Sequence, residues 1–210
     1  NLYNGGVSRQ PGIVPEARVR YTCQQEDATD YPKWQILYTQ SETIRTGHAQ
    51  LFGCDREEIA ITRNASESLE ILLMGMDLKS GDEILTTTQD YPRMLTTLRQ
   101  REKREGLKLK LIQIPIPPKN LDEITAAFAK GITDRTRLIL VAHQVNITGQ
   151  ITPVKAVCDM ARAKGIETIV DGAHSFAQFD FKQKDLGCDY FGTSLHKWLY
   201  APKGTGLLYV

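Results

Sequence analysis

The 210-residue sequence lacks the patterns of a disulfide-stapled, zinc-binding or membrane-spanning protein. Its cysteines, Cys23, Cys54, Cys158 and Cys188, show no CxxC spacing, so neither a metal site nor a disulfide framework is expected. No apolar run is long enough to cross a bilayer, and the first residues show no signal-peptide pattern. A cytoplasmic setting is therefore the expectation, with a leader removed before Asn1 as the alternative.

The sequence also lacks an excess of charge of one sign. Lysine and arginine number 26 against 25 aspartates and glutamates, which gives a net charge of +1. The densest basic stretch, residues 99–110, contains Glu102 and Glu105, and a solvated helix face with the following strand explains it. We therefore expect no nucleic-acid partner and no membrane partner.

What the sequence does have is a regular alternation of strand and helix patterns. Hydrophobic residues make up 41% of it and charged residues 24%, which allows a substantial core. Strands are predicted at residues 58–62, 83–87, 107–114, 137–142, 168–170, 190–193 and 206–210. Helices are predicted at residues 66–76, 92–105, 121–129 and 154–164, the first with Asn64 and Glu67 as a capping box. This alternation predicts an α/β fold with a mostly parallel sheet and helices on both faces.

The two ends of the chain differ from that pattern. Residues 1–35 include Asn4-Gly5-Gly6 and Tyr31-Pro32-Lys33-Trp34 but have little periodicity, so we predict an extended N-terminal arm, then a helix at about 35–52. No repeat or low-complexity linker divides residues 36–210, which are expected to form one domain. At the far end an apolar strand runs to Val210 with no turn after it, so the chain is expected to be cut there.

Two predicted strand ends carry the residues with the clearest chemistry. The run Ile-Glu-Thr-Ile-Val leads into Asp171, and the next predicted strand is followed by Lys197. Ligands of open α/β sheets bind outside the carboxyl ends of the strands. An acid and a lysine placed there suit pyridoxal 5'-phosphate (PLP), whose pyridine nitrogen needs a carboxylate and whose aldehyde forms a Schiff base with a lysine. The alternative for each residue is structural: a solvated surface lysine, and a turn-forming Asp before Gly172.

A phosphate site is predicted from the helix that begins near Asn64. The free N–H groups and positive dipole end at Ala65, Ser66 and Glu67 suit a dianion, and Ser66 adds a hydroxyl. Beside Lys197, Ser194 and His196 are further candidate donors. A plain helix cap and a structural histidine are the alternatives.

Three more residues are candidates to face the cofactor ring. Tyr91 follows the strand at 83–87 and is placed to stack on the ring. Asn146, after the strand at 137–142, is a candidate hydrogen-bond donor to the phenolic oxygen, and His174 is a candidate neighbour of the ring. Packing of Tyr91 in the core and an ordinary turn before Gly149 are the alternatives.

Five ordered motifs together carry a family resemblance that none carries alone. They are Thr62-Arg63-Asn64-Ala65-Ser66-Glu67-Ser68-Leu69, residues 146–153, Asp171-Gly172-Ala173-His174-Ser175, Asp185-Leu186-Gly187-Cys188-Asp189-Tyr190 and Ser194-Leu195-His196-Lys197-Trp198. From about Asn4 to its end, the chain resembles the class V aminotransferase family of fold-type I PLP enzymes, in the isopenicillin N epimerase-like branch. That branch is related to the cysteine desulfurases and selenocysteine lyases.

The resemblance implies the large domain of an aspartate aminotransferase-like PLP enzyme. It implies that Lys197 is the Schiff-base lysine, that Asp171 holds the pyridine nitrogen, and that Ser66, Ser194 and His196 hold the phosphate with the backbone of Ala65 and Glu67. The chain departs from the pattern at Tyr91, where desulfurase-like relatives have a stacking histidine, at His174, where many have glutamine, and at Leu195, where many have glycine.

The resemblance also implies features that the sequence does not contain. Relatives continue into a smaller C-terminal domain, apparently missing here, that supplies an arginine for the substrate carboxylate, and the intact protein is implied to be a homodimer. We expect reaction at the α-carbon of a small-molecule amino acid, of aminotransferase or epimerase type, with Lys197 as general base. A desulfurase- or lyase-type β-elimination and a non-catalytic dimerisation module are the alternatives.

Overall fold

The computed structural model describes residues 5–27, 34 and 37–210, and the predictions for Asn4 and for Tyr31-Pro32-Lys33 lie outside these residues. Strands and helices alternate through most of the described chain. The helices are α1 (Ile13–Asp27), α2 (Leu37–Phe52), η2 (Arg56–Glu58, 3-10), α3 (Ala65–Gly75), α4 (Pro92–Glu105), α5 (Leu121–Gly131), α6 (Val154–Arg162) and α7 (Gln183–Leu186). The strands are β1 (Ile59–Thr62), β2 (Glu83–Thr87), β3 (Lys108–Ile112), β4 (Thr136–Ala142), β5 (Glu167–Asp171), β6 (Tyr190–Ser194) and β7 (Gly206–Tyr209).

The seven strands form one mostly parallel sheet in the order β1-β7-β6-β5-β4-β2-β3. From β6 to β3 every neighbouring pair is parallel. The strand β7 is antiparallel to both of its neighbours, β6 and β1. Parallel neighbours bring the carboxyl ends of β4, β5 and β6 to one edge, where Ala142 pairs with Asp171 and Asp171 with Gly192.

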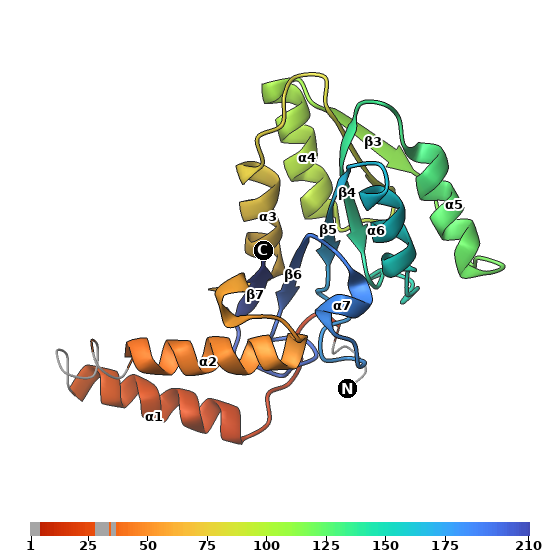
Figure 1. Cartoon of the computed structure of the whole chain (residues 1–210). Helices are drawn as coiled ribbons and strands as arrows, with labels where there is room; N and C mark the ends of the chain where they lie inside the picture. The colour runs from red at the N-terminus through yellow and green to blue at the C-terminus, as the bar shows by residue number, and fades with distance from the viewer. Residues whose placement is uncertain (1–4, 28–33, 35–36) are drawn as a thin grey trace.

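Buried side chains alternate between the two faces of the sheet. In β4, Leu138 and Leu140 belong to a core cluster with side chains of α3 and α4, whereas Ile139 and Val141 belong to a second cluster with α2, α5, α6 and α7. Figure 1 shows α3 and α4 on one side of the sheet and α5 and α6 on the other. The predicted α/β fold, with helices on both faces, is confirmed.

The start of α3 corrects one detail of the sequence prediction. Asn64 is the N-cap, and its Oδ1 accepts a hydrogen bond from the Glu67 N–H at 2.9 Å. The predicted capping box is wrong, however, because the Glu67 carboxylate accepts from the backbone N–H of Arg63 and pairs with the Arg63 guanidinium, both at 2.6 Å. The helix is therefore capped by the Asn64 side chain alone, without the reciprocal hydrogen bond in which the Asn64 N–H donates to the Glu67 side chain.

The extended conformation predicted for the N-terminal arm is wrong for α1. This helix buries none of its side chains, so its sequence has no apolar stripe by which periodicity could predict it. Good helix formers such as Glu16, Ala17 and Arg18 favour it instead, and Pro15 falls in the first turn, where proline is tolerated. The division into an arm and one domain at residue 36 stays a prediction.

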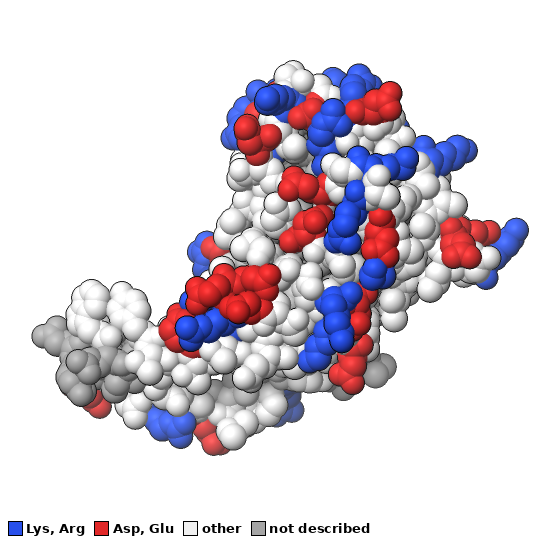
Figure 2. Space-filling model, viewed as in Figure 1, with Lys and Arg blue, Asp and Glu red and all other residues white. Residues whose placement is uncertain are grey.

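Charges on the surface are mixed in sign. Figure 2 shows lysines and arginines interspersed with aspartates and glutamates over the body of the face drawn. Among the described helices, none combines the length and the apolar character that a membrane crossing requires.

Candidate active site

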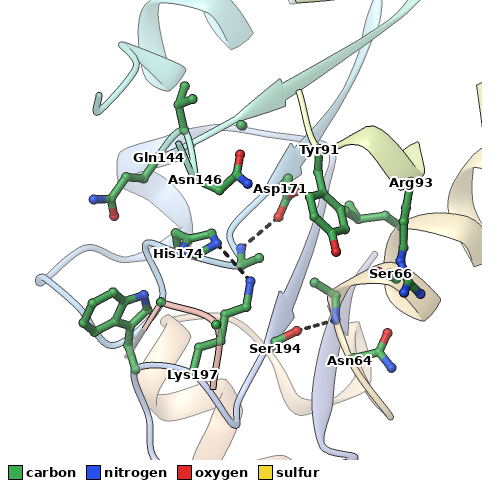
Figure 3. Close-up of a pocket in the computed structure, with 18 of the residues that line it drawn as sticks. Asn64, Ser66, Tyr91, Arg93, Gln144, Asn146, Asp171, His174, Ser194 and Lys197 are labelled. Atoms are coloured by element: carbon green, nitrogen blue, oxygen red, sulfur yellow. Dashed lines mark hydrogen bonds between the residues drawn. The ribbon is translucent and has the colours of Figure 1, made fainter. Parts of the chain in front are cut away.

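A cavity of about 610 Å³ lies where the carboxyl ends of β4, β5 and β6 meet the start of α3. Its size is that of a small-molecule or cofactor site. Figure 3 shows the side chains that converge on it. Nine of the ten predicted cofactor-binding residues line it: Ala65, Ser66, Tyr91, Asn146, Asp171, His174, Ser194, His196 and Lys197. Glu67 does not line it, because its N–H is bonded to Asn64 and its carboxylate to Arg63.

Asp171 is the last residue of β5, in the middle of the sheet, and only 7% of it is exposed. One carboxylate oxygen accepts from the N–H of Ala173 at 2.8 Å. Burial raises the pKa of Asp171, and the Ala173 hydrogen bond and the charge of Lys197 oppose the rise. A buried carboxylate of this kind gains most from a cationic partner in the cavity, which a protonated pyridine nitrogen is.

Lys197 follows β6 and points across the cavity toward His174, with 3.0 Å between Lys197 Nζ and His174 Nε2. Burial lowers the pKa of Lys197, and the charge of Asp171 raises it in part. Burial, with the nearby Lys197 charge, also lowers the pKa of His174 to about 4, so this imidazole is neutral at pH 7. An amine with a lowered pKa is a better nucleophile and base near neutral pH than a surface lysine.

The start of α3 and the end of β6 form the opposite wall of the cavity. The Ala65 N–H donates to Ser194 Oγ at 2.8 Å, which joins residues far apart in the chain and leaves the Ser194 proton free to donate elsewhere. No described residue accepts from the N–H or the hydroxyl of Ser66. Ser66 and Ser194 therefore offer three donors beside a helix N-terminus: the Ser66 N–H, the Ser66 hydroxyl and the Ser194 hydroxyl. Such a setting suits a phosphate.

Three buried polar atoms at the cavity are suited to bond a ligand. Within the described chain, the side-chain atoms His196 Nδ1, Trp198 Nε1 and Gln144 Oε1 are buried and have no hydrogen-bond partner, and all three residues line the cavity. Such atoms are costly unless something in the site bonds to them. Together with the acid at one wall and the free donors at the other, they fit PLP.

Tyr91 is 38% exposed at the cavity, so the alternative of core packing is wrong. Behind it, Asp90 is 3% exposed and accepts from the Tyr91 N–H at 2.7 Å and from the Thr86 hydroxyl at 2.6 Å. Burial, with a contribution from the charge of Asp171, raises the pKa of Asp90 to about 7. Sequence reasoning gave Asp90 no role.

Asn146 both lines the cavity and sits in a turn, so its two interpretations do not exclude each other. The turn is closed by Gly149, at φ +72°, whose N–H donates to the Val145 carbonyl at 2.8 Å. Glycine favours this left-handed conformation.

Several lining residues were missed by the sequence reasoning. Ala173, Trp198 and Asn64 stand beside predicted residues in the quoted motifs, and that adjacency was a usable signal. Gly5 and Gly6 come from the N-terminal segment, and Arg93 from the first turn of α4, where no sequence pattern indicated the cavity.

The fold and the cavity are those of an α/β protein with a ligand site outside the carboxyl ends of its parallel strands. The chain belongs to the aminotransferase class-V family, whose sequence model matches residues 29–210. It is 36% identical over 166 residues to isopenicillin N epimerase of Streptomyces clavuligerus, across 79% of this chain and 42% of that protein. It is 32% identical over 178 residues to a probable cysteine desulfurase of Pyrococcus abyssi, across 84% of this chain and 43% of the relative.

Solved structures give the same family. The cystine C-S lyase C-DES, in complex with its product cysteine persulfide, superposes with a TM-score of 0.90 at 26% identity, over 99% of this chain and 56% of that one. The apo cysteine desulfurase of Thermococcus onnurineus NA1 superposes with a TM-score of 0.85 at 27% identity, over 99% and 52%. The chain thus spans about half the length of the relatives it matches.

Proposed function

We propose that this chain forms the cofactor site of a PLP-dependent enzyme that acts at the α-carbon of an amino acid, of aminotransferase or epimerase type. The observation that carries the proposal is the placement of Lys197 and Asp171 on one cavity, with the donors of Ser66 and Ser194 on the wall between α3 and β6. The match to isopenicillin N epimerase supports an epimerase-type reaction.

When bound, PLP supplies an electron sink that stabilises negative charge at the amino acid's α-carbon. Asp171 would hold the pyridine nitrogen in its protonated form, and Lys197 would hold the aldehyde end of the cofactor through its amine. Because burial lowers its pKa, the free amine of Lys197 would be available near neutral pH as the base for the α-proton. His174 Nε2, at 3.0 Å from Nζ, orients the amine, and a protonated Lys197 donates to it because an ammonium has no acceptor.

A second function is β-elimination of the lyase or desulfurase type. The likeness to the cystine C-S lyase C-DES and to cysteine desulfurases favours it. Against a non-catalytic module stands the retained pair of Asp171 and Lys197 in an assembled cavity. We propose that the intact protein is a homodimer that takes a small amino acid substrate.

Incubation with PLP, borohydride reduction and peptide mapping test the assignment of Lys197. We expect a visible absorbance band and PLP trapped on the peptide that contains Lys197, with both lost in Lys197→Ala. The exposed Lys203, which is not among the lining residues, gives a matched control: Lys203→Ala should keep both signals. Trapping of PLP at an unchanged level in Lys197→Ala would show that the lysine is wrongly assigned.

A further inference from the structure

Arg93, in the first turn of α4, lines the same cavity as Ser66 and Lys197. Its guanidinium forms no ion pair with a carboxylate of any described residue. Some other arginines are held in ion pairs: Arg63 pairs with Glu67 at 2.6 Å, and Arg101 pairs with Glu105 at 2.6 Å. Arg93 is therefore free to bind an anion in the cavity.

The charges on the cavity wall leave a role for such a cation. Among its described lining residues, the groups that can carry positive charge are Arg93, Lys197, His174 and His196. Burial lowers the pKa of both histidines, that of His174 to about 4, and so favours their neutral forms. The amine of Lys197 would be engaged by the aldehyde end of the cofactor, whereas a guanidinium keeps its charge at all relevant pH values. Arg93 is then the one permanent cation on the described wall.

Arg93 lies on the side of the cavity where the phosphate donors are. Figure 3 shows Arg93 on the same side as Ser66 and Tyr91, with Lys197 and His174 on the other side. The free donors there, the Ser66 N–H and hydroxyl and the Ser194 hydroxyl, are uncharged. A phosphate dianion bound to neutral donors alone lacks a counter-charge, and a guanidinium provides one in a bidentate geometry.

We propose that Arg93 binds the phosphate group of PLP. This inference rests on the proposed function, because it presupposes that PLP occupies the cavity. It adds a phosphate ligand from α4 to those offered by α3 and β6, and it assigns Arg93 to cofactor retention rather than to the reacting carbon.

The test is a comparison of PLP with pyridoxal, which has the same aldehyde and ring but no phosphate. Dissociation constants of both are measured by absorbance titration of the purified apo protein and of Arg93→Gln. We expect Arg93→Gln to weaken PLP about tenfold and to leave pyridoxal within about twofold, since one charge-assisted contact at a solvent-accessible position is lost. Arg93→Lys, which keeps the charge without the fork, should fall between.

Arg99 provides the matched control, because it is an exposed arginine on the same helix and does not line the cavity. Arg99→Gln should bind PLP as the unaltered protein does. If Arg93→Gln binds PLP with unchanged preference over pyridoxal, the proposal is overturned. The proposal is overturned in that case even if Arg93→Gln binds amino acids more weakly. Weaker binding of amino acids would assign Arg93 to the substrate carboxylate. If the unaltered protein links no PLP to Lys197, the proposed function is wrong, and the proposal for Arg93 is wrong with it. This outcome is seen without any Arg93 variant, so the two failures can be told apart.

Discussion

Replacing the buried Asp90 by Asn should make the stability of the apo protein less dependent on pH. Burial and the charge of Asp171 raise the pKa of Asp90 from 3.8 to about 7 in the folded chain. Its protonated form is therefore favoured by folding, and the stability it contributes is complete below pH 3.8 and is lost progressively as the pH rises from 3.8 through 7. At about 1.4 kcal/mol per pKa unit, the loss at pH 8 is on the order of 4 kcal/mol.

Asn keeps the shape of Asp90 and both of its contacts, because its oxygen accepts from Tyr91 and its amide donates to a reoriented Thr86 hydroxyl. Asn does not titrate. The free energy of unfolding of Asp90→Asn should exceed that of the unaltered protein by about 2 kcal/mol at pH 5 and by about 4 kcal/mol at pH 8.

Urea unfolding at pH 5, 6, 7 and 8, followed by circular dichroism, measures the difference in the free energy of unfolding between Asp90→Asn and the unaltered protein. Asp134, which is exposed and whose side chain forms no hydrogen bond or ion pair with the described residues, serves as control, and Asp134→Asn should change the free energy of unfolding by less than about 0.5 kcal/mol. If the difference in the free energy of unfolding for Asp90→Asn does not increase between pH 5 and pH 8, the reasoning is refuted.

Three further perturbations test other parts of the structure. Gly206→Ala should destabilise the protein by about 1–3 kcal/mol in urea unfolding and weaken PLP binding, because the new Cβ would lie 2.6 Å from the backbone N of Asn64; unchanged stability would contradict this packing. Gly47→Ala, in α2 with no atom within 4 Å of the new Cβ, should instead stabilise by about 0.5–1 kcal/mol, and a loss of stability would show that the glycine is needed there. Asp171→Asn should lower the pKa of Lys197 further, since it removes the charge that opposes the effect of burial; amine labelling against pH with peptide mapping checks the direction, and a rise would contradict it.

Elements with both a periodic pattern and local end signals could be predicted closely. The strand at 83–87 and the helix at 92–105 were predicted with the bounds that the structure has. Pro92 at the first helical position and Gly106 after the last, at φ +76°, mark the helix ends in the sequence itself. Such signals depend only on neighbouring residues, which a sequence displays.

Elements and contacts that depend on the rest of the fold could not be predicted in this way. The helix α1 packs nothing into the core and so leaves no pattern. Arg93 and Asp90 flank Tyr91 and Pro92 in sequence, yet Arg93 lines the cavity and Asp90 is buried behind Tyr91. The direction of the first turn of α4 decides these positions, and the sequence does not display it. Of the candidate site, sequence reasoning supplied nine lining residues at the start of α3 and at or after the ends of the strands β2, β4, β5 and β6, and the fold added Arg93, Gly5 and Gly6.

The phosphate wall shows most directly why topology was needed. The Ala65 N–H reaches Ser194 only if α3 lies closely over β6 and β7, and two glycines permit that approach. A Cβ on Gly192 would stand 3.0 Å from the side chains of α3. A Cβ on Gly206 would stand 2.6 Å from the backbone N of Asn64, which directly precedes α3. The Ser68 hydroxyl then donates to the Leu207 carbonyl at 3.0 Å and fixes the helix on the antiparallel strand. The donors for an anion are therefore a consequence of how closely α3 packs, so substitutions at these two glycines should reduce cofactor affinity without altering any residue that touches the cofactor.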